Sequence, residues 1–217
     1  MKLFNILILM VSVLAGNAQN NPSDFNISLC SGDLLFCSTT SGTLSKAIDE
    51  VTQTEIETHF SHIGIIEIQN DTVWVLHSAP KKGVCRETIG KFLFPEKEKI
   101  TATVYRLKNS FQNTIPEALK KAQTYLGQEY NYSYILEDEG VYCSEFIYEI
   151  FASDSIFMLN PMTFKNPETG RFIAGWTDHY QKLGIPVPEG KPGCNPNGMA
   201  ASEKLERLGE LKFRIRK

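Results

Sequence analysis

The sequence predicts an α+β fold, in which an antiparallel sheet carries helices packed on one side. Segments typical of strands lie mostly before a long helical stretch, and several of them can be joined by hairpins. Strands followed by helices, rather than alternating with them, favour this class.

The strands are predicted from short apolar or alternating runs. They are expected at Leu34–Cys37, Ser61–Ile68, Val73–Leu76 and Ala102–Leu107. The second and third are joined through Gln69-Asn70-Asp71-Thr72, and Asn-Asp suits the tip of a hairpin, although less strongly than Asn-Gly.

Three helices are expected. Leu44–Val51 carries its apolar residues on one face. Ile115–Tyr125 has Pro116 in its first turn and ends at Gly127. Cys143–Phe151 is strongly apolar. Beyond Pro161 the chain is rich in Pro, Gly and Asn, which predicts either an ordered wrap or a mobile tail on the same domain.

The composition is that of a globular protein. Of 217 residues, 42% are hydrophobic and 22% are charged, with 22 Lys and Arg against 25 Asp and Glu. A net charge of -3 provides no global field for holding polyphosphate, so nucleic acid is not expected as a partner.

The first 18 residues resemble a secretory signal. Lys2 precedes an apolar run from Ile6 to Leu14, and small residues precede a cut after Ala18. The run is shorter than the roughly 20 residues of a spanning helix, so no integral membrane span is expected after processing. A membrane-tethering helix is the alternative. We expect an exported protein, periplasmic or secreted, with one domain over residues 19–217.

Export changes how the five cysteines are interpreted. Exported proteins can keep disulfides, and an odd number leaves at least one thiol free. A bridge between Cys30 and Cys37 and simple burial of both remain open. No C-x-x-C pair exists, so neither a zinc knuckle nor a thioredoxin-type site is expected.

Cys143 is a candidate nucleophile because it opens the apolar helix. Unsatisfied N–H groups and the helix dipole favour the thiolate at such a position. The same amides can receive a developing oxyanion. A buried cysteine that merely caps the helix is the alternative.

Hairpin arithmetic brings two histidines together. With Asn70-Asp71 at the tip, paired residues sum to 141, so Gly64 faces His77. His62 lies two residues from Gly64 on the same face, about 7 Å from His77 between Cβ atoms. One imidazole can be the base and the other can orient it.

The remaining histidines are weaker candidates. His59 and His62 point to opposite faces of a strand, so half a metal site is not expected there. His179 lies in a segment that resembles surface. We expect no metal and no cofactor.

These residues resemble the YiiX/YaeF-like proteins, circularly permuted relatives of the NlpC-type, papain-like cell-wall amidases and peptidases. The resemblance rests on Gly32-Asp33-Leu34-Leu35-Phe36, Ser61-His62-Ile63-Gly64-Ile65, Gly83-Val84, Tyr130-Asn131 and Tyr142-Cys143-Ser144-Glu145-Phe146-Ile147-Tyr148. The order of His before Cys is what permutation implies. The same layout occurs in lecithin:retinol acyltransferase-like enzymes.

The resemblance implies a papain-like fold, an antiparallel sheet or small barrel, and roles for particular residues. Cys143 would be the nucleophile, His62 the general base and His77 the third polar residue. Tyr130 would help to stabilise the oxyanion, and Tyr142 and Glu145 would lie at the oxyanion or substrate site. NlpC-type enzymes usually have Asp-Cys-Ser-Gly, and this departure loosens any inference of a cell-wall substrate.

We therefore expect an exported cysteine hydrolase that cleaves an amide, or an ester, in a cell-wall peptide or N-acyl substrate. A lipid-directed acyl hydrolase or acyltransferase and a non-catalytic peptide- or lipid-binding module are the alternatives. A long apolar groove beside Cys143 would favour lipid, and a polar cleft with a carboxylate for a free amine would favour peptide.

Overall fold

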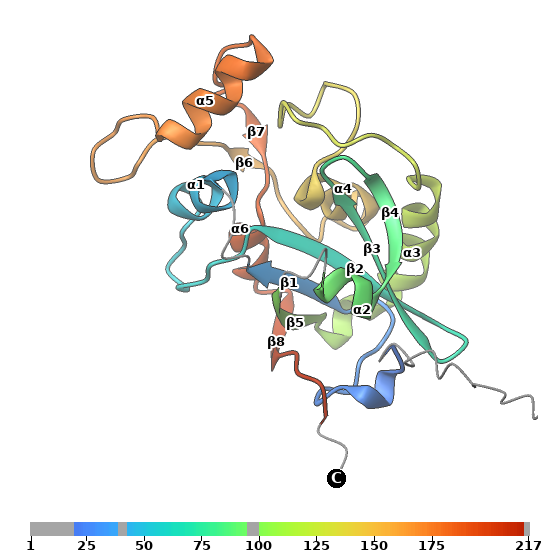
Figure 1. Cartoon of the computed structure of the whole chain (residues 1–217). Coiled ribbons are helices and arrows are strands. Elements are labelled where there is room, and N and C mark those ends of the chain that lie inside the picture. Colours follow the sequence, from blue (N-terminus) through green and yellow to red (C-terminus); the bar gives the residue numbers. More distant parts are fainter. Residues whose placement is uncertain (1–19, 39–42, 95–99, 215–217) are drawn as a thin grey trace, which may run out of the picture.

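The computed structural model describes residues 20–38, 43–94 and 100–214 of the chain (Figure 1). Its centre is a six-stranded antiparallel sheet with the order β4-β3-β2-β1-β5-β8. The strands are β1 (Leu34–Ser38), β2 (His62–Gln69), β3 (Thr72–Ala79), β4 (Gly83–Thr88), β5 (Thr101–Leu107) and β8 (Leu205–Glu210). The sheet is open, with β4 and β8 at its edges, so the papain-like fold is present without closure into a barrel.

Helices cover the sheet unequally. The helices are α1 (Thr43–Val51), α2 (Ile89–Leu93), α3 (Ile115–Thr124), α4 (Cys143–Ile150), α5 (Ala174–Leu183) and α6 (Pro196–Ala200). Most pack with the larger core, where Ile63 and Ile65 of β2 meet the apolar face of α4. The shorter α2 packs with β3 and β4 on the other face of the sheet.

The predicted hairpin is confirmed in its register. Ile66 pairs with Val75 and Ile68 with Val73, so each pair sums to 141 as expected. Asn70 and Asp71 both have positive φ, of 50° and 55°. Two consecutive left-handed residues form the tight turn that matches the twist of the flanking strands.

The chain beyond Pro161 is an ordered wrap. It contains α5, α6, the strand β7 (Pro192–Gly193), which pairs with β6 (Asn160–Pro161) in a small ribbon, and the edge strand β8. β8 pairs with β5, so this segment completes the main sheet. The sequence interpretation missed β8, α5 and β4.

Gly83 is required where β4 meets the loop before α4. The N–H of Val84 donates to the carbonyl of Gln128 at 2.8 Å. A Cβ atom on Gly83 would lie 2.0 Å from that carbonyl oxygen, and φ here is +64°. Only glycine permits this approach and this conformation without displacement.

Two further expectations can be placed. All five cysteines are unpaired, so the possible bridge between Cys30 and Cys37 is not formed; Cys37 is buried and Cys30 exposed. The predicted signal segment, residues 1–18, lies outside the described residues. None of the described helices is both long and apolar enough to cross a bilayer.

The buried Asp33 carboxylate anchors β1 to β5. It accepts from Arg106 Nε at 2.6 Å and Nη2 at 2.8 Å, and from the Cys30 N–H at 2.8 Å. We expect Asp33→Ala to lower the free energy of unfolding by about 3 kcal/mol, because the arginine loses its partner in a partly buried site. Urea denaturation measures this.

The matched control is Glu117→Ala, which removes an exposed pair with Lys120. It should change the free energy of unfolding by less than about 0.5 kcal/mol. Equal effects of the two substitutions would contradict the role given to Asp33.

Candidate active site

Cys143 lies where β2 and β3 separate. Ile65 and Leu76 are the last residues that pair between these two strands at this end. Beyond it, the Ser78 hydroxyl of β3 donates to the carbonyl of Val141, just before α4, at 2.6 Å. The backbone N–H of Ile63 on β2 donates to the Cys143 sulfur. The sulfur is therefore held beside the residue that directly follows His62.

The two predicted histidines are in contact. His62 Nε2 lies 2.8 Å from His77 Nδ1, and the rings meet edge to face. Gly64 makes this approach possible, because a Cβ atom there would lie 2.7 Å from Val75 Cγ1 and 3.2 Å from His77 Cβ. The hairpin argument thus placed both rings on one face correctly.

A third group, which the sequence interpretation missed, continues the chain of contacts. Glu87 Oε2 lies 3.3 Å from His77 Nε2, and both side chains are buried. Lys82 and Lys91 contact Glu87 Oε1 at 3.0 and 3.1 Å. Glu87 is on β4 opposite Val75, and the pairing of β3 with β4 places it on the face of His77.

The Glu87 carboxylate determines which ring nitrogens of His77 and His62 carry protons. The His77 contact and the two lysines hold the pKa of Glu87 below its usual range, so the carboxylate can only accept. His77 then carries its proton on Nε2 and accepts at Nδ1 from His62 Nε2–H. This leaves a lone pair on His62 Nδ1, the nitrogen that does not face His77.

Burial keeps both the thiol and the imidazole neutral. It raises the pKa of Cys143 to about 11, although the N–H groups of Ser144, Ile63 and Cys143 act in the opposite direction. Burial and, as the second cause, the neighbouring His77 lower the pKa of His62 to about 3. The expectation of a thiolate at the helix N-terminus is therefore wrong for the resting site, because desolvation outweighs the helix amides.

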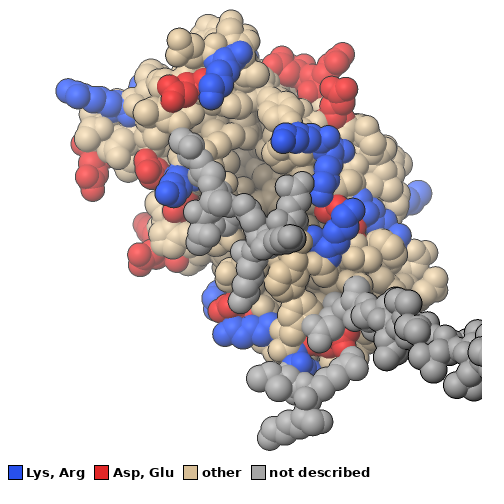
Figure 2. All heavy atoms as spheres, in the orientation of Figure 1, with Lys and Arg blue, Asp and Glu red and all other residues tan. Residues whose placement is uncertain are grey.

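A cavity opens beside Cys143 between α1, α4 and the β6–β7 ribbon. Its volume is about 120 Å³. Its described lining contains no Lys, Arg, Asp, Glu or His; aromatic and aliphatic members include Tyr130, Tyr134, Trp176, Phe164, Met162, Ile48 and Val51. Figure 2 shows a hollow in this region whose floor is tan, with Lys or Arg atoms along its right-hand rim.

The other predicted site residues divide into two groups. Tyr130 and Tyr142 line the cavity together with Cys143. The Tyr130 hydroxyl lies 3.3 Å from that of Tyr134, and the Tyr142 hydroxyl accepts from the Cys194 N–H at 3.2 Å. Glu145 is absent from the lining: its carboxylate accepts from the Tyr142 N–H at 3.0 Å and caps α4. The structure thus gives Glu145 a structural position.

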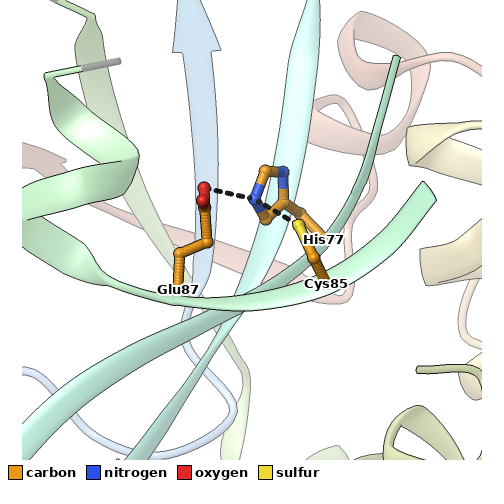
Figure 3. A group of neighbouring side chains, drawn as sticks. All are labelled: His77, Cys85 and Glu87. Atoms are coloured by element: carbon orange, nitrogen blue, oxygen red, sulfur yellow. Dashed lines mark hydrogen bonds and ion pairs between the residues drawn. The ribbon is translucent and has the colours of Figure 1, made fainter. Parts of the chain in front are cut away.

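Potential metal donors come together at one place among the described residues, although the sequence predicted no metal site. His59 Nδ1 pairs with Asp49 at 2.9 Å, and His179 Nε2 contacts the carbonyl of Tyr132 at 2.7 Å. His77, Cys85 and Glu87 instead place one nitrogen, one sulfur and one oxygen within 4.8 Å of one another (Figure 3). Their chemistry and spacing fit a metal ion.

Comparison with known proteins identifies a family and a shared fold. The family described as "permuted papain-like amidase enzyme, YaeF/YiiX, C92 family" matches residues 28–209. The uncharacterized protein YiiX of Escherichia coli strain K12 is 30% identical over 123 residues, which span 55% of this chain and 56% of that protein. The match thus spans little more than half of that relative.

A solved structure shares the fold. It is titled as the crystal structure of metalloprotein yiiX from Escherichia coli O157:H7. The TM-score is 0.65 at 19% identity, and the match covers 82% of this chain and 95% of that chain.

The raised pKa of Cys143 predicts how its reactivity depends on pH. Only the thiolate reacts rapidly with iodoacetamide, so alkylation of Cys143 should be slow at pH 6 and should rise steadily through pH 9. Mass spectrometry of the peptide that contains Cys143 measures the rate.

Cys30, which is exposed, serves as the internal comparison in the same samples. At each pH it should react faster than Cys143. A rate at Cys143 that is already constant between pH 5 and pH 8 would contradict the neutral resting pair and indicate a preformed thiolate.

Proposed function

Because the chain belongs to the YaeF/YiiX family of permuted papain-like amidases, we propose that it is a cysteine hydrolase that cleaves the amide bond of an N-acyl substrate. The observation that carries the proposal is the unbroken chain of contacts from Glu87 through His77 to His62, together with the Cys143 sulfur held at the N–H of Ile63, the next residue after His62.

The reaction begins with proton transfer during attack. His62 Nδ1 takes the proton of Cys143 as the sulfur bonds to the substrate carbonyl carbon, because neither group is charged beforehand. The carbonyl oxygen becomes an oxyanion that accepts from the Cys143 N–H and the Tyr130 hydroxyl.

The proton that His62 has taken completes the first half of the reaction, and water supplies the proton for the second half. His62 returns it to the departing nitrogen, the carbon–nitrogen bond breaks, and an acyl-thioester remains on Cys143. A water molecule then attacks the thioester, its proton passes through His62 to the sulfur, and the carboxylic acid leaves. His77 and Glu87 stabilise the His62 imidazolium that forms in each half, so they are positioning residues.

The lining of the cavity favours an apolar acyl group as the part of the substrate that binds there. A charged muropeptide would bring ammonium or carboxylate groups against walls whose described residues carry no charge to pair with them. An aliphatic acyl chain would instead bury its surface against Val51, Met162 and Trp176. The uncharged lining therefore favours N-acyl substrates over cell-wall peptides.

Two further expectations belong to this proposal. We propose export directed by residues 1–18. The solved relative is titled a metalloprotein, and here His77, Cys85 and Glu87 would hold such an ion. Bound there, a metal would supply positive charge behind His77, on the side away from His62; the reaction described above uses none.

The positioning role of Glu87 predicts a defined loss. Glu87→Gln keeps the shape but removes the negative charge that stabilises the His62 imidazolium, so kcat should fall about 10- to 100-fold while KM stays within about twofold. The assay is hydrolysis of a fluorogenic N-octanoyl arylamide, with Cys143→Ala as the inactive reference.

Glu67→Gln is the matched control, since it neutralises a carboxylate that pairs with Arg86 on the same ribbon. It should leave kcat unchanged. If the two Gln variants lose activity equally, Glu87 acts only through general stability of the ribbon.

The apolar wall predicts the substrate preference. Val51→Lys should lower kcat/KM for the N-octanoyl substrate about tenfold or more, because the acyl chain would then bury a charge. The rate of Cys143 alkylation by the small reagent iodoacetamide should change less than twofold.

Ile56→Lys makes the same chemical change at an exposed position outside the cavity and should have no effect. Faster hydrolysis of a charged muropeptide than of the N-octanoyl amide by the unaltered protein would refute the acyl preference.

A further inference from the structure

We propose that His77, Cys85 and Glu87 form a binding site for zinc or a similar divalent ion, and that occupation of this site switches off Cys143. The site itself stands on geometry alone. The inhibitory consequence rests on the proposed hydrolase function.

Two of the three donor–donor distances match tetrahedral coordination. Cys85 Sγ lies 3.4 Å from His77 Nε2, and Glu87 Oε2 lies 3.3 Å from the same nitrogen. Zinc bonds of 2.0 to 2.3 Å place neighbouring ligands of a tetrahedron about 3.3 to 3.7 Å apart. The nitrogen is therefore already at tetrahedral spacing from both other donors, and the sulfur and the carboxylate oxygen lie within 4.8 Å of each other.

The strands hold this arrangement. His77 pairs directly with Cys85 across β3 and β4, and Glu87 follows two residues later on the same face. Figure 3 shows the carboxylate and the sulfur approaching the same ring nitrogen of His77. An ion would displace few atoms, because the donors already converge.

The charges around the site can adjust. The ion would bind the Cys85 thiolate, the Glu87 carboxylate and neutral His77 Nε2, and the Cys85 thiol would release its proton to solvent. Lys82 and Lys91, which now pair with Glu87, have side chains that are 47% and 69% exposed. Both can move into water when the ion arrives. Cys85 is only partly buried, so solvent can supply the fourth ligand.

The ion would reverse the protons of the two histidines. With the metal on Nε2, His77 must carry its proton on Nδ1, which lies 2.8 Å from His62 Nε2. His62 Nε2 then has to accept, so its own proton moves to Nδ1. The lone pair that would receive the Cys143 proton is gone, and His62 no longer acts as the base.

Binding is tested first on a protein without the nucleophile. Cobalt(II) added to Cys143→Ala should give one equivalent of tetrahedral cobalt with a sulfur-to-metal charge-transfer band. The band should disappear in Cys143→Ala/Cys85→Ser and persist in Cys143→Ala/Cys30→Ser, which removes an exposed thiol elsewhere. Zinc should displace the cobalt.

Inhibition is tested in the protein with Cys143 present. Saturating zinc should slow both alkylation of Cys143 by iodoacetamide and hydrolysis of the N-octanoyl substrate by at least about tenfold, the scale of a lost general base. The ratio of rates with and without zinc is taken within each variant. It should return to near one in Cys85→Ser.

The outcomes separate the two proposals. A cobalt band that survives Cys85→Ser, or no cobalt binding at all, overturns the metal site and leaves the hydrolase untouched. Binding that depends on Cys85 without slower alkylation overturns the switch. Absence of hydrolysis alongside zinc-sensitive alkylation overturns the proposed substrate but supports the switch.

Discussion

A carboxylate has no proton to donate, and the arrangement of the whole site follows from that constraint. Glu87 is buried between two lysines and His77, so the histidine must direct an N–H toward it. Each ring can then be in only one tautomer, and the free lone pair emerges at His62. Without the anion, the two imidazoles could exchange donor and acceptor roles, and neither orientation would be preferred.

The nucleophile depends on a different constraint, the point at which β2 and β3 part. If β2 and β3 continued to pair, the Ile63 N–H would donate to β3. Because they part, this N–H can donate to the Cys143 sulfur. Ser78 binds the backbone before α4, and Gly83 lets the preceding loop approach β4. The helix is thus attached to the same hairpin that carries both histidines, so the groups are positioned by one short piece of sheet.

The parts of this site that sequence reasoning reached are those set by local chemistry. The turn at Asn70-Asp71 determines the register, and the register places His62 and His77 on one face. Glu87 was missed because it lies among lysines and resembles a solvated charge; only its pairing across β3 and β4 shows that it is buried. β8 was missed because it pairs with β5 across a long separation, and no local pattern marks such an edge strand. Burial, which reverses the expected direction of the Cys143 pKa, is likewise a property of the assembled core.

The two ends of the described chain leave the molecule together. Phe25 and Phe213 bridge one another, and the backbone of Asn26 donates to that of Lys212. Both ends lie at the base of the molecule as drawn in Figure 1, whereas α1 and the β6–β7 ribbon, which border the cavity, lie near its top. A tether joined at either end would therefore leave the cavity facing away from the attachment point. Immobilisation on a surface through a terminal tag is thus compatible with free access of large substrates.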